Sequence, residues 1–290
     1  MKIEHSPVNI DSLANYKNNK SNFFTPISLN QGSETIAFYS LVSAGKIQEE
    51  STLADFDTFS ILLEGSGLFG FGTKLVTAKS GDCRLIPKNR ESFFINTSDD
   101  EAVMVGFFLG PQGKEQPKMS YTELTEAIIK TPSSETGLIA DKDGILVNTA
   151  DSSLENMIKS EGWEISDFRL PISKIHGSTS TLFRAQFMPG SVHKKHTHQE
   201  CDEIYYVISG FGLAGAGKER VEVRSGDFHF ISKGTEHWLH NLSNTEPIEV
   251  VGIYCKAGSV EETGYVYNGE VTAKDLNERT SRSGAMICLK

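Results

Sequence analysis

From Thr35 onward, short apolar runs alternate with turns that contain glycine. The runs are rich in β-branched and aromatic residues, and their regular spacing predicts antiparallel strands packed as a sandwich or barrel. The strands expected in the first half are Ile36–Val42, Phe59–Leu63, Gly67–Phe71, Lys74–Thr77, Arg84–Ile86, Ser92–Ile95 and Val103–Phe108. Those expected in the second half are Thr181–Met188, Ile204–Ser209, Val221–Arg224, Phe228–Ile231, His237–Asn241 and Ile248–Tyr254.

The two halves repeat one another at a constant offset. Four landmarks of the second half lie 145 residues (190 − 45) after their counterparts in the first half: Gly190 after Gly45, Gly210 after Gly65, Gly226 after Gly81 and Asn241 after Asn96. Because this period is as long as a domain, it predicts two copies of one barrel rather than a solenoid.

The stretch from Gly190 to Asn241 contains the residues with the most specific chemistry. In an extended strand successive side chains point to opposite faces, so His196 and His198 share one face. Glu203 opens the next strand after a turn, and His237 arrives from a later strand. Three imidazoles and one carboxylate suit a borderline divalent metal ion.

The same stretch resembles the paired motifs of the cupin superfamily. The first motif, Gly-x5-His-x-His-x4-Glu-x6-Gly, matches at every position from Gly190 to Gly210. The second, Gly-x5-Pro-x-Gly-x2-His-x3-Asn, matches from Gly226 to Asn241 except at Ser232, where the family has proline. That proline shapes a turn, so its replacement leaves the ligand set intact. The resemblance implies an all-β fold of two tandem cupin barrels (double-stranded β-helix, or jelly roll) joined by a partly helical linker.

At the 145-residue offset, the four ligand positions of the first half are occupied by Ser51, Leu53, Thr58 and Ser92. These residues do not form a plausible ligand set for a borderline metal. We therefore expect the N-terminal barrel to have kept its turns and lost its ion. It serves as a scaffold or, as the alternative, as a metal-free ligand pocket.

The domain organisation follows from the two barrels and the segments around them. We expect an N-terminal arm at 1–30, an N-terminal cupin barrel without metal ligands at 31–112, a partly helical linker at 113–168, a C-terminal cupin barrel with the metal site at 169–260, and a tail at 261–290. Ser120 to Glu123 forms a capping box, which predicts a helix to about Lys130. A second short helix is expected over 153–160.

Tyr205 shares the face of Glu203 and is expected to point into the barrel. It is either a core aromatic residue or a catalytic and substrate-binding residue that donates a hydrogen bond to a bound anion or to metal-bound oxygen.

Arg184 and Gln186 are the other candidates for substrate binding. They share one face of the strand that enters the site, while Phe183 and Phe187 share the other. If the polar face points inward, Arg184 binds a substrate carboxylate bidentately. If the aromatic face points inward, the pocket is apolar, and we slightly favour this arrangement.

Charge and cysteine content narrow the partners and the compartment. The chain has a net charge of −10 and no basic stripe, so we expect neither nucleic acid nor a membrane as a partner. Its first residues lack the apolar run of a signal peptide. The four cysteines have no paired spacing, which indicates reduced thiols and a cytoplasmic location. The family resemblance adds the expectation of a homodimer.

A four-residue ligand set on an ion that prefers six ligands leaves two open positions, which favours catalysis. Iron and manganese are the first candidates for the ion, followed by nickel, zinc and copper. Our first hypothesis is an oxidoreductase, a dioxygenase acting on a small organic molecule. The alternatives are a non-oxidative isomerase, decarboxylase or lyase acting on a small acid or sugar, and a non-catalytic small-molecule-binding cupin.

Overall fold

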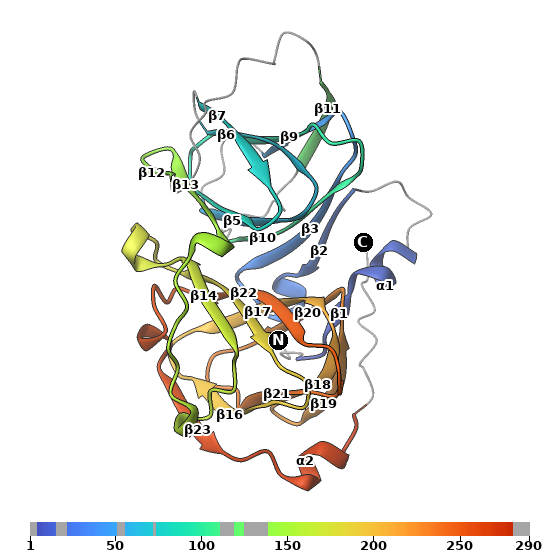
Figure 1. The fold of residues 1–290 in the computed structure, drawn as a ribbon, viewed down its shortest axis with the longest axis vertical. Coiled ribbons are helices and arrows are strands. Elements are labelled where there is room, and N and C mark those ends of the chain that lie inside the picture. The colour runs from blue at the N-terminus through green and yellow to red at the C-terminus, as the bar shows by residue number, and fades with distance from the viewer. Residues whose placement is uncertain are drawn as a thin grey trace. The chain divides into compact units, whose positions relative to one another are not determined.

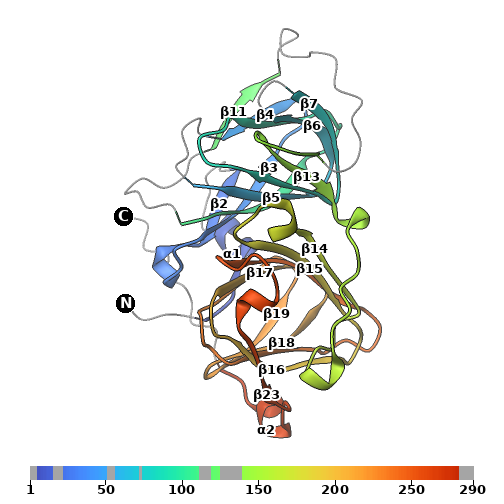
Figure 2. The same cartoon turned by 90° about the vertical axis from the view of Figure 1, so that its left-hand side faces the viewer.

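The computed structural model describes residues 5–15, 22–50, 56–71, 74–110, 119–124 and 139–280. The chain divides into two compact units (Figures 1 and 2). One unit contains Glu34–Ser153 and Lys17–Thr25; the other contains Leu154–Lys290, Met1–Tyr16 and Pro26–Ser33. Each unit is a barrel of two antiparallel sheets, which confirms the predicted all-β, two-barrel architecture. Within the described residues, no helix has the length and apolar character needed to cross a membrane.

The N-terminal barrel consists of a seven-stranded sheet in the order β12-β13-β8-β5-β10-β3-β2 and a five-stranded sheet in the order β11-β4-β9-β6-β7. Its strands are β2 (Phe23–Ile27), β3 (Ile36–Val42), β4 (Lys46–Glu50), β5 (Thr58–Glu64), β6 (Ser66–Phe71), β7 (Lys74–Lys79), β8 (Asp82–Ile86), β9 (Ser92–Asn96), β10 (Ala102–Phe108), β11 (Met119–Glu123), β12 (Ile139–Asp141) and β13 (Gly144–Asn148). Aromatic side chains such as Phe38, Phe69 and Phe94 fill its core.

The C-terminal barrel consists of a six-stranded sheet in the order β1-β20-β17-β22-β15-β14 and a five-stranded sheet in the order β19-β18-β21-β16-β23. Its strands are β1 (Val8–Asn9), β14 (Asp167–Ile172), β15 (Thr181–Phe187), β16 (Val192–His198), β17 (Asp202–Ser209), β18 (Phe211–Ala216), β19 (Glu219–Arg224), β20 (Asp227–Ile231), β21 (His237–Asn241), β22 (Ile248–Cys255) and β23 (Tyr265–Gly269). The helical segments in the described residues are α1 (Ile10–Asn15), α2 (Ala273–Asn277) and the 3₁₀ turns η1 (Leu29–Gln31), η3 (Thr149–Asp151), η4 (Lys159–Glu161), η5 (Lys174–His176) and η6 (Glu261–Thr263).

The repeat seen in the sequence is also present in the backbone. Gly81 and Gly226 both have a φ of 88°, a left-handed conformation that glycine adopts without steric cost. Asn96 and Asn241 hold equivalent turns, because each side-chain amide donates to the carbonyl of the last residue of β3 or β15. The 145-residue offset therefore identifies equivalent positions in the two barrels.

Each barrel is completed by a strand from outside its own repeat. Strand β13, which precedes the second repeat, pairs with β8 of the N-terminal barrel, while β1 pairs with β20 of the C-terminal barrel. Equivalent hydrogen bonds anchor the two strands. Asn148 Nδ2 donates to Asp82 Oδ1 over 2.8 Å, and Asn9 Nδ2 donates to Asp227 Oδ1 over 2.7 Å. Strand β1 of the predicted N-terminal arm is therefore part of the C-terminal barrel, whereas β2 of the same arm belongs to the N-terminal sheet.

The segment expected to be a partly helical linker is built differently. The helix predicted at Ser120 is wrong, since Met119–Glu123 forms β11 and pairs with β4. Instead of capping a helix, Ser120 Oγ donates to Glu49 on the paired strand β4, and the Tyr121 hydroxyl bonds to Ser40 on β3 of the other sheet. The remainder of that predicted helix lies outside the described residues. Strands β12 and β13 of this segment extend the N-terminal sheet.

The second predicted helix, over 153–160, is also wrong: Leu154 makes an isolated bridge to Arg169, and a 3₁₀ turn begins at Lys159. At the other end of the chain, the tail contributes β23, which pairs with β16. Asp275 of α2 forms ion pairs with Lys195 and Arg220, so both segments belong to the C-terminal barrel.

Candidate metal centre

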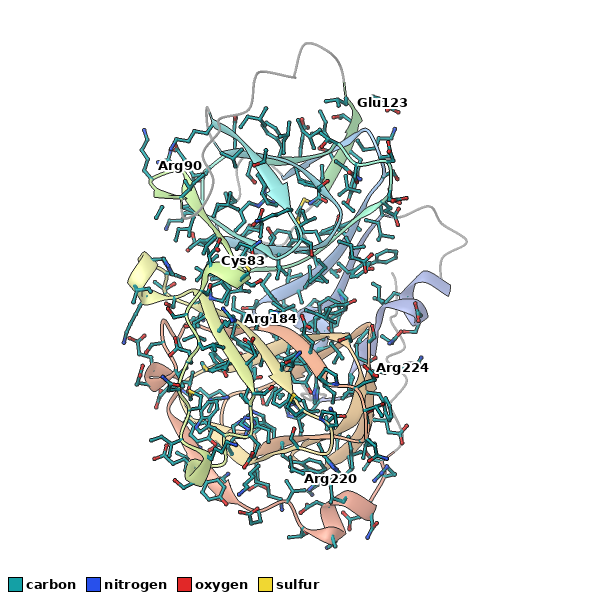
Figure 3. The ribbon with its side chains drawn as sticks, viewed as in Figure 1. Cys83, Arg90, Glu123, Arg184, Arg220 and Arg224 are labelled. Carbon is teal, nitrogen blue, oxygen red and sulfur yellow. The ribbon has the colours of Figure 1, made fainter. Side chains whose placement is uncertain are left out.

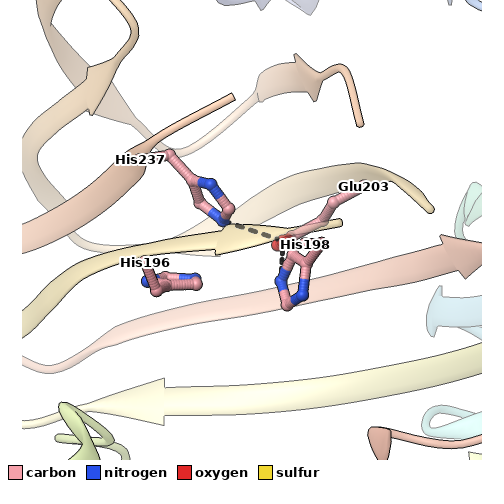
Figure 4. A group of neighbouring side chains, drawn as sticks. All are labelled: His196, His198, Glu203 and His237. Atoms are coloured by element: carbon pink, nitrogen blue, oxygen red, sulfur yellow. Dashed lines mark ion pairs between the residues drawn. The ribbon is translucent and has the colours of Figure 1, made fainter. Parts of the chain in front are cut away.

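Four predicted ligand residues converge inside the C-terminal barrel (Figure 4). His196 and His198 project from β16, His237 lies opposite His196 on β21, and Glu203 projects from β17 in the other sheet. One ligand atom from each residue lies within 4.8 Å of the others, and all four residues are buried. The two sheets thus bring three imidazoles and one carboxylate to a single point.

Backbone carbonyls orient two of the imidazoles. His196 Nδ1 lies 2.7 Å from the carbonyl oxygen of Lys194, and His237 Nδ1 lies 2.9 Å from that of Thr235. A carbonyl oxygen only accepts hydrogen bonds, so each Nδ1 carries the proton and each Nε2 presents a lone pair. Histidines that bind metals are usually held in this way.

The distances within the cluster fit neighbouring ligands of one ion. Glu203 Oε2 lies 3.1 Å from His198 Nε2 and 3.2 Å from His237 Nε2, yet neither nitrogen makes a well-directed hydrogen bond. Two ligand atoms at right angles on an ion with bonds of about 2.0–2.2 Å are about 3 Å apart. Burial raises the pKa of Glu203, but the imidazoles of His198 and His237 outweigh it and hold that pKa below its ordinary range. The residues therefore fit a divalent metal.

A cavity lined by His196, Glu203 and His237 adjoins the cluster, with about 40 Å³ of room for the centres of water-sized molecules. Its walls are largely aromatic and aliphatic. They include Phe168, Phe183, Phe187, Leu239, Val250 and Tyr254. The aromatic face of β15 therefore points inward, as the favoured alternative predicted.

Arg184 and Gln186 consequently lie on the outward face of β15. Figure 3 labels Arg184. Its guanidinium forms an ion pair with Glu249 of β22 over 2.7 Å. Neither Arg184 nor Gln186 lines the cavity, so the structure does not bring them to the place where they were expected to bind substrate. The physical reason is the alternation of the strand, which places either these residues or the phenylalanines inside, and burial favours the phenylalanines.

Tyr205 lines the cavity, as predicted from its parity with Glu203, but its hydroxyl proton is committed elsewhere. Tyr205 Oη lies 2.6 Å from His229 Nδ1, and His229 Nε2 lies 2.7 Å from the carbonyl oxygen of His5. Because that carbonyl only accepts, His229 carries its proton on Nε2, and Tyr205 donates to Nδ1. Tyr205 was expected to donate a hydrogen bond to a ligand. In this arrangement its hydroxyl oxygen can only accept one from a ligand.

His193 is a cavity residue that strand parity did not identify. Its ring centroid lies 4.4 Å from that of His196, and its Nδ1 bonds to the carbonyl of Gly162. An odd spacing should place His193 and His196 on opposite faces, but a register shift between them brings both inside. Burial, with a smaller contribution from His237, lowers the pKa of His193 to about 4. A β-bulge of this kind has no clear sequence signal.

In the N-terminal barrel, two of the four equivalent positions are described. Thr58 and Ser92 are both buried, and Ser51 and Leu53 lie outside the described residues. Thr58 and Ser92 offer hydroxyl groups in place of the carboxylate of Glu203 and the imidazole of His237.

Comparison with known proteins finds a family model that matches the segment containing this site. Residues 183–254 match the model of the cupin domain. Over 72 residues the chain is 31% identical to an oxalate-binding protein of Thermotoga maritima, a match that covers 25% of this chain and 60% of that protein. The chain spans about three fifths of the length of the curated relatives it matches.

Solved structures share the two-barrel fold. The oxalate decarboxylase of Bacillus subtilis, a protein with Mn(II) centres, superposes with a TM-score of 0.67 at 11% identity and covers 92% of this chain and 80% of its own. Procruciferin, an 11S globulin of Brassica napus, superposes with a TM-score of 0.64 at 12% identity, covering 81% and 80%. At these identities the likeness shows the fold alone.

Proposed function

From a cupin domain at residues 183–254 within a two-barrel fold, we propose that this chain is a metal-dependent enzyme that performs non-oxidative chemistry, such as decarboxylation, on a small carboxylic acid. One observation carries the proposal: three imidazole nitrogens and one carboxylate oxygen lie within 4.8 Å of one another beside a cavity. The names of the similar proteins support a carboxylic acid, and they favour the non-oxidative alternative over the dioxygenase that we expected first.

His196, His198, His237 and Glu203 would hold the ion. Iron and manganese remain the first candidates, and the Mn(II) centres of the Bacillus subtilis decarboxylase support manganese. A bound divalent ion supplies a Lewis acid that polarises a carbonyl or carboxylate oxygen. The apolar walls exclude water, which strengthens electrostatic interactions inside the cavity.

Two neighbouring side chains can accept a proton or a hydrogen bond from the bound acid. The Tyr205 hydroxyl donates its own proton to a hydrogen bond with His229 Nδ1, and a lone pair on its oxygen is free to accept. His193 donates from Nδ1 to Gly162, which leaves its Nε2 as an acceptor. Both residues line the cavity.

The test combines metal analysis with product analysis. Protein purified without chelators is expected to contain about one divalent transition metal per chain, because three imidazoles and one carboxylate suit such an ion. Incubation with a panel of small 2-oxo and dicarboxylic acids should release carbon dioxide or an isomer without consuming oxygen. Stoichiometric oxygen uptake would restore the dioxygenase hypothesis, and a protein that takes up no metal would refute both.

A second candidate function is binding without catalysis. The resemblance to the oxalate-binding protein of Thermotoga maritima supports it, because the printed name of that protein describes binding. A metal-loaded protein that binds an acid stoichiometrically and returns it unchanged would establish this alternative.

A further inference from the structure

We infer that the acid bound at this site is a monoanion with a short apolar tail, rather than a dicarboxylate such as oxalate. This inference rests on the proposed function, because it assumes that an ion and a carboxylic acid meet at the cluster. It goes further in naming the part of the acid that does not touch the ion.

The walls of the cavity define the environment of that tail. Phe183 and Phe187 of β15, Val250 of β22 and Leu239 of β21 line it, and each is nearly inaccessible to solvent. Phe183 is fixed in place by stacking on Tyr254, with ring centroids 4.6 Å apart. Transfer of an apolar group from water into these surroundings is favourable. A charged group would lose its hydration here, which is unfavourable.

The charge of the cluster matches one carboxylate. Among the described residues that line the cavity, Glu203 supplies the formal negative charge. His196 and His237 present neutral Nε2 lone pairs, because their Nδ1 protons are bonded to carbonyls. A divalent ion with one glutamate and neutral imidazoles has a net charge of +1. One carboxylate neutralises it, while a second would be buried without a compensating charge.

The side chain that could have neutralised a second carboxylate points away from the cavity. Arg184 lies between the inward-facing Phe183 and Ala185, and its guanidinium is paired with Glu249. Strand alternation prevents it from reaching the cavity without a rearrangement of β15.

The size of the cavity limits the tail to a few atoms. A site for one water requires about 10–15 Å³ measured in this way, so about 40 Å³ gives room for roughly three such positions. A 2-oxo acid with three carbons beyond its chelating oxygens fits this space. The geometry thus points to short aliphatic 2-oxo or 2-hydroxy acids.

A matched pair of ligands tests the inference. 2-Oxopentanoate and 2-oxoglutarate have the same chelating group and the same number of carbons, but the first ends in a methyl group and the second in a carboxylate. Each is titrated into the Mn(II)-loaded full chain, and binding is followed by calorimetry and tryptophan fluorescence. Trp163 reports on the site, since the centroid of its ring lies 6.3 Å from that of His196.

We expect 2-oxopentanoate to bind at least about tenfold more tightly than 2-oxoglutarate. Equal or tighter binding of 2-oxoglutarate, or tighter binding of oxalate than of 2-oxopentanoate, would overturn the inference and leave the proposed function standing. A metal-loaded protein that binds none of these acids would overturn both.

Two variants separate the inner and outer faces of β15. Phe187→Ala removes part of the apolar wall and should weaken binding of 2-oxopentanoate several-fold more than that of 2-oxoglutarate. Arg184→Gln should leave both affinities within about twofold, because Arg184 lies outside. A selective loss of 2-oxoglutarate binding in Arg184→Gln would contradict the inference, and Val250→Ala replaces Phe187→Ala if the latter does not fold.

Discussion

The two barrels share a framework and differ in their interiors. In each, an aromatic ring lies over a glycine on the neighbouring strand: Phe38 over Gly106 in the N-terminal barrel and Phe183 over Gly252 in the C-terminal barrel. A Cβ at either glycine would come within 2.3–2.4 Å of the ring, so both positions require glycine. These shared contacts maintain the barrel regardless of what it binds.

The interior positions have diverged. Two residues before the shared glycine, the N-terminal barrel has Met104 where the C-terminal barrel has Val250, and Phe94 stands where the other has Leu239. In both positions, the residue in the N-terminal barrel is the larger one, and its counterpart lines the cavity. At these two interior positions the N-terminal barrel therefore carries bulkier side chains, while its turns match those of the C-terminal barrel.

A second diverged pair lies on the adjacent strands. Tyr205 and His229 face each other across β17 and β20, and the equivalent positions on β5 and β8 carry Ser60 and Arg84. The Arg84 guanidinium lies over the Phe69 ring, 4.6 Å from its centroid, and Nε donates to Ser60. This arrangement fills the N-terminal interior with one long side chain.

Removal of a metal-ligating side chain should produce the largest difference between the two barrels. His196→Ala and His237→Ala are each expected to reduce the metal content from about one per chain to near zero in a protein that remains folded. Elemental analysis and circular dichroism measure both properties. Ser92→Ala, at the position equivalent to His237, is the matched control and should keep its metal. Loss of metal in Ser92→Ala would show that the N-terminal barrel contributes to ion binding.

Acid should destabilise the C-terminal barrel selectively. Burial lowers the pKa of His229 to about 3, so the folded state stays neutral while the unfolded state binds a proton below about pH 6.5. The stabilisation is complete above pH 6.5 and is lost as the pH falls, by about 2 kcal/mol at pH 5. No histidine occurs between residues 34 and 153 of the N-terminal unit.

Hydrogen exchange of the metal-free protein at pH 7 and pH 5 measures this difference. Protection should fall in β17 and β20 and persist in β5 and β8. His229→Gln is expected to reduce the pH dependence. Equal acid sensitivity of the two barrels would contradict the assignment of the effect to His229.

The anchoring asparagines offer a matched pair of substitutions. Asn9→Ala removes the hydrogen bond to Asp227 and should destabilise the C-terminal barrel by about 1–2 kcal/mol, since a buried carboxylate loses a donor. Asn148→Ala should have a similar effect on the N-terminal barrel through Asp82. Chemical denaturation with hydrogen exchange in each barrel separates the two. An Asn9→Ala variant that weakens the N-terminal barrel instead would refute the strand assignment.

Exchanging the interior residues should produce the smallest effects. Val250→Met is expected to retain the metal and weaken 2-oxopentanoate binding about tenfold, because the longer side chain occupies the cavity. Met104→Val should cost the N-terminal barrel about 1 kcal/mol through lost packing. Calorimetry and thermal melts provide the measurements. Unchanged binding in Val250→Met would show that the ligand does not use this wall.

Local rules predicted most of the fold and the ligand set. Strand spacing, turn glycines and the alternation that pairs His196 with His198 depend on neighbours in sequence, and the structure confirms that the four cluster residues converge. The pairing of β1 with β20 could not be predicted, because nothing near Asn9 indicates a partner at Asp227. The same holds for Ser120, where pairing with β4 overrides a local helix signal.

The exchange of β1 and β13 has a consequence for synthesis on the ribosome. The N-terminal barrel can close soon after residue 148 emerges, since β13 finds β8 about sixty residues behind it. Strand β1 is translated before the N-terminal barrel, but its partner follows 218 residues (227 − 9) later. At about 5–20 residues per second, that interval lasts roughly 10–40 s. The barrel with the candidate metal site therefore matures last, and the nascent chain must keep β1 from pairing elsewhere in the meantime.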